Sequence, residues 1–206
     1  MKSVLITGGT VRIGLAIAGR LRSAGWRVIT SSHRAGAGAD IVADLSEPSG
    51  AARLFAAASA LLGGGVPDAL VNNAALFAGE AQKIAAVNLE SAKKLTVMMA
   101  GREFGRGAVV NILDCRDDRE GAYGESKREL RRWTLRAAAM FAGTISVNGV
   151  APGPVLKPAG VSEKAGECPL GRPEADDVAQ AVEFLLAARA TTGCIIPVDG
   201  GQSILI

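Results

Sequence analysis

The sequence has few of the residues that build metal sites, disulfide frameworks and membrane spans. Among 206 residues there are one histidine and three cysteines, Cys115, Cys168 and Cys194. Three cysteines cannot all pair, and their spacing fits no metal-ligand motif, so we expect reduced thiols and no metal. No apolar run is long enough to span a membrane, and the first one begins too early to leave room for a signal peptide. We therefore expect a cytoplasmic protein that does not bind membranes.

The chain also has little excess charge and few aromatic side chains. The formal net charge is +3, hydrophobic residues make up 49% of the sequence, and aromatic residues make up 4%. A small positive charge can help to attract an anionic cofactor, but it gives no reason to expect nucleic acid as a partner. The composition is that of a globular protein, and the length suffices for one domain with a full core.

Apolar runs alternate with helical patterns along the whole chain. The predicted strands are Val4–Thr7, Arg27–Ser31, Ile41–Ala43, Ala69–Val71, Ala108–Leu113, Thr144–Val150 and Cys194–Pro197. The predicted helices are Ile13–Ala24, Ser49–Leu62, Ala81–Met99, Ala122–Phe141 and Ala175–Ala187. This alternation indicates right-handed crossovers and a parallel sheet that is covered on both faces. We predict a single α/β domain over residues 1–206, a doubly wound Rossmann-type fold with a seven-stranded sheet.

A glycine-rich turn, Thr7–Gly14, joins the first predicted strand to the first predicted helix. Such a turn lets the backbone approach a pyrophosphate, and the helix N-terminus offers free N–H groups to the anion. Arg12 stands where a dinucleotide-binding loop usually has its second glycine. A P-loop is excluded because no Gly-Lys-Ser/Thr follows. The candidate cofactor-binding residues here are Gly8, Thr10, Arg12, Ile13 and Gly14.

The end of the second strand indicates which dinucleotide would bind. An NAD site usually has an acidic residue there, whereas this chain has Ser32, His33 and Arg34. A hydroxyl, an imidazole and a guanidinium can bind a 2′-phosphate, and Arg12 would lie close by, so the pattern favours NADPH over the alternative of a solvated basic loop. After the third strand, Asp44 and Leu45 are candidates for the adenine edge. Alternatively, Asp44 is only a turn residue before a helix.

Two further motifs follow later strands. Asn72–Ala75 comes after the fourth strand, where small residues let a cofactor lie against the backbone and asparagines can tie neighbouring strands together. Its candidate cofactor-binding residues are Asn73, Ala74 and Ala75, and the alternative is an ordinary turn. Tyr123 and Lys127 are spaced to share one helix face. A nearby ammonium would make the phenol a better acid, and the lysine can hold a ribose hydroxyl; the alternative is a surface pair.

In their order along the chain, these motifs resemble those of the short-chain dehydrogenase/reductase family. The ordered set is Thr7–Gly14, Asp44, Asn72–Ala75, Asn88, Tyr123 with Lys127, the stretch Asn148–Pro154, and Val198–Gly201. The resemblance implies that Asn88 holds a water linked to Lys127 in a proton relay. It also implies that Pro152, Gly153 and Val155 lie against the nicotinamide. Members commonly assemble through the helices predicted at Ala81–Met99 and Ala122–Phe141, so a homo-oligomer, a tetramer or a dimer, is expected.

One branch of the family, the pteridine reductases with the dihydromonapterin reductases, resembles this chain more narrowly. The family's usual serine after the fifth strand is replaced by Asp114, and that branch pairs an aspartate with the tyrosine. It also shares the arginine of the glycine turn and the His-Arg pair, and it places an aromatic at the position of Phe77. The resemblance implies Tyr123, Lys127, Asp114 and Asn88 as catalytic residues, and Phe77, Asp114 and Tyr123 as the residues that bind a pterin.

The residues leave some alternatives open. Phe77 can be a core or loop-packing side chain, and Asp114 a solvent-exposed strand end. Asp117, Asp118 and Arg119 in the same loop compete for the role of Asp114, and the brief segment Val155–Leu170 leaves the pocket open or completed by a neighbouring subunit. The leading hypothesis is an NADPH-dependent reductase of dihydropteridines. The alternatives are a reductase of another small carbonyl compound and a non-catalytic NADP(H)-binding sensor.

Overall fold

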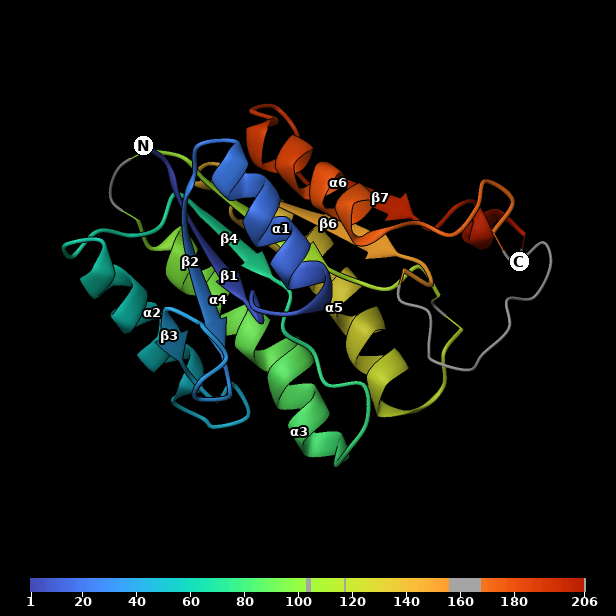
Figure 1. Cartoon of the computed structure of the whole chain (residues 1–206), viewed down its shortest axis with the longest axis horizontal. Helices are drawn as coiled ribbons and strands as arrows, with labels where there is room; N and C mark the ends of the chain where they lie inside the picture. Colours follow the sequence, from blue (N-terminus) through green and yellow to red (C-terminus); the bar gives the residue numbers. More distant parts are fainter. Residues whose placement is uncertain (103–104, 117, 156–167, 206) are drawn as a thin grey trace.

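Seven parallel strands form one twisted sheet at the centre of the molecule (Figure 1). The structure, a computed structural model, describes residues 1–102, 105–116, 118–155 and 168–205, so Asp117 and most of Val155–Leu170 lie outside the described residues. The sheet order is β3-β2-β1-β4-β5-β6-β7. The strands are β1 Ser3–Thr7, β2 Arg27–Ser32, β3 Ile41–Val42, β4 Ala69–Asn72, β5 Gly107–Ile112, β6 Ile145–Pro152 and β7 Ile195–Val198. All seven predicted strands are confirmed, with ends that shift by at most two residues.

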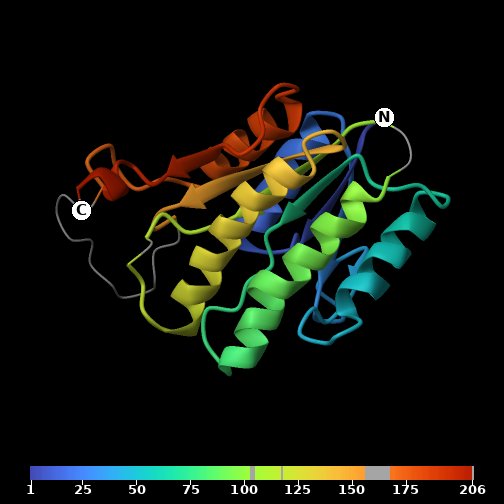
Figure 2. The same ribbon diagram turned by 180° about the vertical axis from the view of Figure 1, so that it is seen from behind.

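Helices cover both faces of the sheet, as predicted. On one face α1 (Arg12–Ser23) packs beside α6 (Ala175–Ala187), in front of the sheet in Figure 1. On the other face lie α2 (Gly50–Leu61), α4 (Ser91–Ala100) and α5 (Gly121–Met140), which Figure 2 shows from behind. The short helix α3 (Ala81–Ala85) leads into α4. No helix in the described ranges is long and apolar enough to cross a membrane.

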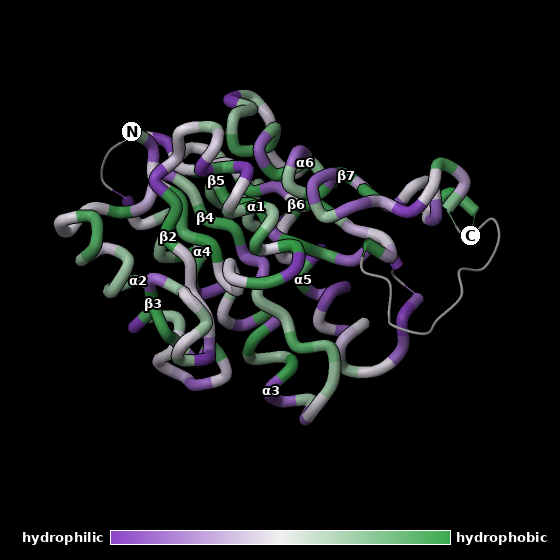
Figure 3. Tube along the Cα trace, in the orientation of Figure 1, coloured by the Kyte–Doolittle hydropathy of each residue, from purple (hydrophilic) through white to green (hydrophobic). Residues whose placement is uncertain are grey.

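The central strands are apolar on both sides because both faces of the sheet are covered. In β1, Leu5 faces the core under α2 and α4, while Val4 and Ile6 face the core under α1 and α6. All three side chains are fully buried. Figure 3 shows the same continuous hydrophobic colouring along β4. A run without polar residues is the pattern expected of a parallel strand that is buried on both faces.

One predicted helix is interrupted. The sequence predicts a continuous helix over Ala81–Met99, but the structure has a π-helical turn, Ala86–Glu90, between α3 and α4. Such a turn adds a residue to the helical repeat, and π-turns occur frequently at functional sites. Here it points Asn88 inward, where its side chain is 1% exposed. The apolar period does not reveal this insertion, because the helices on either side keep their buried faces.

Candidate active site

The predicted site residues gather at the carboxyl edge of the sheet. The strand order reverses direction at β1 and β4, which are neighbours with β2 and β5 on their outer sides. In doubly wound sheets, ligands bind in the crevice outside the carboxyl ends of the strands at this point. The loops after β1, β2, β4, β5 and β6 all open on this edge, and they carry most of the candidate residues.

The glycine turn after β1 is shaped by its two outer glycines. Gly8 has φ +63°, a left-handed conformation that suits glycine. A Cβ on Gly14 would collide with the Gly8 carbonyl oxygen and would lie 2.6 Å from Asn73 Nδ2. The first turn of α1 therefore packs directly on the loop, as a dinucleotide-binding loop requires.

Arg12 keeps the backbone conformation of the glycine that it replaces. Its φ is +53°, the one positive value at a non-glycine residue in the described ranges. This conformation costs an L-residue roughly 1–2 kcal/mol. The side chain is exposed at the start of α1. Strain at a loop that faces a cofactor crevice favours a functional role for the guanidinium.

Thr7 and Asn73 join the glycine turn to the end of β4. Thr7 Oγ1 accepts hydrogen bonds from the backbone N–H groups of Asn73 (3.0 Å) and Ala74 (2.9 Å). Asn73 Nδ2 donates to the carbonyl oxygens of Thr7 and Gly8, each at 2.9 Å. The neighbouring Asn72 donates from Nδ2 to Asn111 Oδ1 on β5 at 2.8 Å. The prediction that these asparagines tie neighbouring strands together is confirmed.

The basic residues after β2 lie at the surface. Arg34 Nε donates to His33 Nε2 at 3.1 Å, and the Arg34 backbone N–H donates to Ser32 Oγ at 3.1 Å. His33 and Arg34 are exposed, and β2 pairs with β1 as far as Thr7 and Ser31, which brings this loop beside the glycine turn. The structure shows no carboxylate bonded to either side chain, so within the described residues both remain available to a phosphate.

Asp44 makes the contacts of a turn residue. Its Oδ1 accepts hydrogen bonds from the Ser46 backbone N–H (2.8 Å) and from Ser46 Oγ (2.7 Å), and these bonds lower the pKa of the Asp44 carboxyl. Leu45 is buried in the core under α2. The observed contacts of Asp44 are those of a turn residue before a helix. Its contact with the adenine edge stays a prediction.

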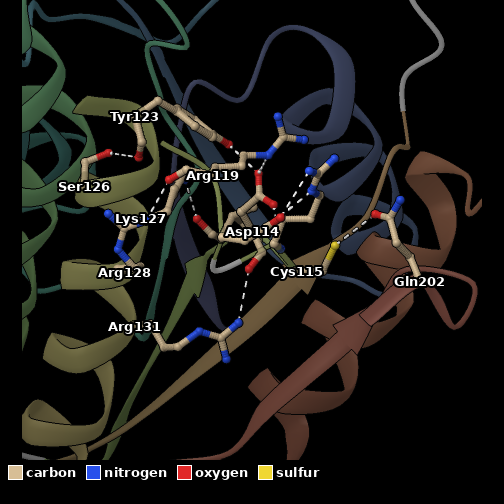
Figure 4. A network of polar contacts seen from close by, with 12 residues as sticks. Asp114, Cys115, Arg119, Tyr123, Ser126, Lys127, Arg128, Arg131 and Gln202 are labelled. Atoms are coloured by element: carbon tan, nitrogen blue, oxygen red, sulfur yellow. Dashed lines mark hydrogen bonds and ion pairs between the residues drawn. The ribbon is translucent and has the colours of Figure 1, made fainter. Parts of the chain in front are cut away.

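The fifth strand and α5 bring Asp114 and Tyr123 together. Tyr123 Oη donates a hydrogen bond to Asp114 Oδ2 at 3.0 Å (Figure 4). Asp114 Oδ1 accepts from the Arg116 backbone N–H at 2.9 Å, and its side chain is 11% exposed. The alternative of a solvent-exposed strand end is therefore wrong. Of its competitors, Asp118 pairs with Arg116 at the surface instead.

Lys127 lies one helical turn after Tyr123 and is fully enclosed. Its Nζ donates to the Ile112 carbonyl oxygen at 2.7 Å and lies 5.8 Å from the centre of the Tyr123 ring. Burial lowers the pKa of Lys127 to about 8, against the opposing influence of Asp114. The shared helix face is confirmed, and the alternative of a surface pair is wrong.

The pKa of Tyr123 shifts in the opposite direction to the one predicted, and Lys127 is not among the causes of the shift. Burial and the adjacent Asp114 carboxylate raise the pKa of Tyr123 above its usual value. A phenol that donates to a carboxylate resists ionisation, because the anion would face a second negative charge. The sequence shows the spacing of Tyr123 and Lys127, but not that the tyrosine oxygen points at an acid.

Asn88 is bonded to the loop after β4 and to α5. Its Oδ1 accepts from the Leu76 backbone N–H at 2.7 Å, and its Nδ2 donates to the Leu76 carbonyl oxygen and to Ser126 Oγ, each at 3.0 Å. Ser126 Oγ in turn donates to the Tyr123 carbonyl oxygen at 2.7 Å. This places Asn88 close to the Tyr123 helix, while its water-holding role stays a prediction.

Phe77 is on the surface rather than in the core. Its side chain is 67% exposed, and its ring centre lies 4.8 Å from that of Tyr123 at an angle of 50°. The core alternative is therefore wrong. Arg119 completes this cluster: its Nε lies 3.3 Å from Asp114 Oδ2, and its Cζ lies 5.8 Å from the Phe77 ring centre.

The stretch at the end of β6 packs between the loop after β5 and the end of β7. A Cβ on Gly153 would lie 2.7 Å from Asp199 Cα, and the Gly153 N–H donates to the Val198 carbonyl oxygen at 2.9 Å. Pro152 accepts at its carbonyl from the Cys115 N–H at 3.0 Å, and Val155 turns back onto the Gly153 carbonyl. Pro152, Gly153 and Val155 thus lie at the same edge as Asp114.

Sequence reasoning missed several residues that shape the site. Arg131 donates to the Asp114 carbonyl oxygen at 3.1 Å, and Figure 4 shows it on the opposite side of Asp114 from Tyr123. Thr7 and Ser126 have the bonding roles given above. Of these, Ser126 is predictable from the sequence, because it lies three residues after Tyr123 on the same helix face. The contact of Arg131 depends on the path of the loop after β5, which the sequence does not show.

One cavity among the described residues lies away from all these side chains. It measures about 790 Å³ at the amino edge of the sheet, between Lys2, Trp26 and Arg189. A second cavity of about 570 Å³ is lined by residues that include Cys115, Asp118 and Arg131. Burial raises the pKa of the Cys115 thiol to about 12, so this cysteine is an unreactive thiol rather than a nucleophile. The polar groups around Asp114 and Tyr123 therefore converge outside the 790 Å³ cavity.

Known proteins resemble this chain over most of its length. A family model described as enoyl-(acyl carrier protein) reductase matches residues 10–203. The rhamnolipids biosynthesis 3-oxoacyl-[acyl-carrier-protein] reductase of Pseudomonas aeruginosa is 30% identical over 96% of this chain and 94% of its own length. The galactitol 2-dehydrogenase of Rhizobium johnstonii is 32% identical over 96% of this chain and 93% of its own.

Solved structures resemble the chain as well. FolM alternative dihydrofolate reductase 1 from Brucella canis, complexed with NADP, superposes with a TM-score of 0.88 at 31% identity, covering 98% of this chain and 94% of that one. The corresponding protein from Brucella suis, also in complex with NADP, superposes with a TM-score of 0.87 at 30% identity, covering 98% and 95%.

Proposed function

The chain belongs to the short-chain dehydrogenase/reductase family, and we propose that it is an NADPH-dependent reductase of a dihydropteridine-type C=N bond. The observation that carries the proposal is the hydrogen bond from Tyr123 Oη to Asp114 Oδ2. The rest of the site supports it, with Lys127 on the same helix face as Tyr123 and Phe77 beside its ring.

The residues at the carboxyl edge fit NADP(H). Gly8, Thr10, Arg12, Ile13 and Gly14 form the loop for the pyrophosphate, with the first N–H groups of α1 behind it. Ser32, His33 and Arg34, together with Arg12, supply the groups that bind a 2′-phosphate, where an NAD site has a carboxylate. Asn73, Ala74, Ala75, Pro152, Gly153 and Val155 line the path toward Tyr123. The NADP-bound similar structures support this assignment.

The chemistry of Asp114 distinguishes a C=N substrate from a ketone. When bound, NADPH supplies a hydride to a ring carbon, and the adjacent nitrogen must then gain a proton. An ionised carboxylate only accepts hydrogen bonds, so Asp114 can bind an N–H edge of a pteridine. A ketone oxygen also only accepts, and it gains negative charge as it is reduced, so an adjacent carboxylate opposes that reaction.

The proton is delivered by Tyr123. Its hydroxyl points at Asp114 and lies next to the position of the ring that stacks on Phe77. The O–H bond breaks as the substrate N–H bond forms, and the Lys127 ammonium returns a proton to the tyrosinate and regains one from solvent. In this proposal Asn88 keeps the Tyr123 helix and the Phe77 loop in place. Asn88 also holds a water molecule that links Lys127 to solvent.

A screen of NADPH oxidation tests this function. Dihydrobiopterin, dihydromonapterin and dihydrofolate should each be compared with simple ketones, with NADH as the control for the cofactor. We expect turnover with a dihydropteridine and a preference for NADPH. Tight NADPH binding without turnover of any dihydropteridine would contradict the proposal.

Reduction of a small carbonyl compound is the second candidate, and the similarity to a 3-oxoacyl-[acyl-carrier-protein] reductase favours it. Asp114→Ser separates the two candidates, because it supplies the hydroxyl that polarises a carbonyl. It should abolish pterin reduction and spare or improve ketone reduction. If Tyr123→Phe left every activity unchanged, both would fail in favour of a non-catalytic NADP(H)-binding sensor.

A further inference from the structure

The side chain of Arg119 contacts two residues, Asp114 and Phe77, that the proposed function assigns to the substrate. Its Nε is 3.3 Å from Asp114 Oδ2, the same oxygen that accepts from Tyr123 Oη. Its Cζ is 5.8 Å from the centre of the Phe77 ring, within the range of a cation–π contact. One planar group therefore contacts both the carboxylate and the exposed aromatic ring that the proposed function assigns to a substrate.

A guanidinium and the edge of an aminopyrimidine share their chemistry. Both are flat, both carry nitrogen donors bonded to one carbon, and both pair with a carboxylate and stack on an aromatic ring. A group that contacts Asp114 and Phe77 together therefore excludes a heterocycle that makes the same two contacts.

The Arg119 side chain is held less firmly than its backbone. The Arg119 carbonyl oxygen accepts a hydrogen bond from Arg128 Nη1 at 2.7 Å, and it packs so closely on Gly124 that a Cβ there would collide with it. By contrast, Nε is buried and makes no hydrogen bond among the described residues, because its approach to Asp114 has the distance of an ion pair but not the direction of a hydrogen bond. A buried N–H without a hydrogen bond is unfavourable, so the side chain can leave this position while the backbone stays.

We propose that Arg119 is an internal competitor of the substrate, and that the site accepts flat heterocycles with an amidine or guanidine edge, which displace its guanidinium from Asp114 and Phe77. This rests on the proposed function and narrows it, because it names the edge of the substrate that is recognised. Arg119 is a specificity-determining residue in this arrangement and takes no part in proton transfer.

Replacing Arg119 by Ala tests the proposal in the NADP⁺-loaded protein. We expect the Kd of a dihydropteridine for the variant, measured by titration calorimetry, to be about tenfold lower than for the unaltered protein. In the variant the substrate no longer has to displace one ion pair and one cation–π contact. The matched control is Arg116→Ala, in the same loop, whose side chain pairs with the exposed Asp118 and whose backbone bond to Asp114 is kept. It should leave the Kd unchanged.

A second measurement does not depend on pterin binding. Methylguanidinium should bind the Arg119→Ala variant at millimolar concentration, and it should bind neither the unaltered protein nor the double variant with Asp114→Asn. Failure of methylguanidinium to bind Arg119→Ala would overturn the role of Arg119. A weaker affinity of Arg119→Ala for a dihydropteridine would also overturn it, because it would show that Arg119 binds the substrate. If no dihydropteridine binds any form but methylguanidinium binds as expected, the proposed function fails and the position of Arg119 stands.

Discussion

The side-chain amide of Asn88 pairs with both backbone polar groups of Leu76, the residue before Phe77. The π-helical turn Ala86–Glu90 points Asn88 inward, and this pairing holds the loop that presents Phe77 to Tyr123. An irregularity in one helix therefore positions an aromatic ring on a different loop.

Removing the Asn88 amide should release this loop. Asn88→Ala loses three hydrogen bonds at a buried position, so the free energy of unfolding should fall by about 2 kcal/mol. Because Phe77 then loses its fixed position, KM for the substrate should rise more than kcat falls. Urea unfolding and steady-state kinetics measure the two effects. A variant with unchanged stability would show that water replaces the amide.

Arg12 should contribute to NADPH affinity at the expense of backbone strain. Arg12→Gly removes the guanidinium and relieves the left-handed φ of +53°, whereas Arg12→Ala removes the guanidinium and keeps the strain. Both variants should bind NADPH about tenfold more weakly, since a charge-assisted contact to a phosphate is lost, and both should bind NADH nearly as before. Arg12→Gly should be the more stable of the two. Equal losses for NADPH and NADH would place Arg12 at the pyrophosphate instead of the 2′-phosphate.

Gly14 should tolerate no side chain. The Cβ of Gly14→Ala would collide with the Gly8 carbonyl oxygen and crowd Asn73 Nδ2, so we expect a loss of about 1–3 kcal/mol in unfolding free energy and weaker NADPH binding. Gly19→Ala is the matched control in the same helix, because the added Cβ would meet no atom within 4 Å beyond the neighbouring residues and backbone of its own helix. It should stabilise the protein by about 0.5–1 kcal/mol. Thermal unfolding with and without NADPH compares the two variants.

Lys127 should make stability depend on pH in an alkaline range. Its pKa in the folded state is about 8, below the ordinary lysine value of 10.5, so the folded protein binds fewer protons than the unfolded chain between these values. Stability from this group therefore rises as the pH increases through 8 toward 10, by up to about 3 kcal/mol, while below pH 8 the cost of burying the ammonium is fully present.

The comparison variant for this effect is Lys127→Met, which has no proton to lose. Denaturant unfolding at pH 7, 8, 9 and 10 should show the unaltered protein gaining stability relative to Lys127→Met across the range. A constant difference between the two would mean that Lys127 titrates alike in the folded and unfolded states. Activity of the variant should be lost at every pH, because the proposed relay needs the ammonium.

Much of the fold follows from local pattern. The seven strands are predictable because each is an apolar run bounded by turn residues, and parallel strands buried on both faces must be apolar throughout. The helices follow from the 3.6-residue period, which fails at Ala86–Glu90 because an inserted residue changes the register without changing the buried faces.

The sequence by itself determined the sheet, the glycine turn with Arg12 in place of glycine, and the presence of Tyr123, Lys127 and Asp114 on neighbouring elements, because these depend on local periodicity and on the order of strands. Only the tertiary structure decided that Tyr123 donates to Asp114, that its pKa rises instead of falling, and that Arg119 lies against Phe77. Those outcomes depend on burial and on the direction of each side chain, which are set by packing between segments far apart in the chain.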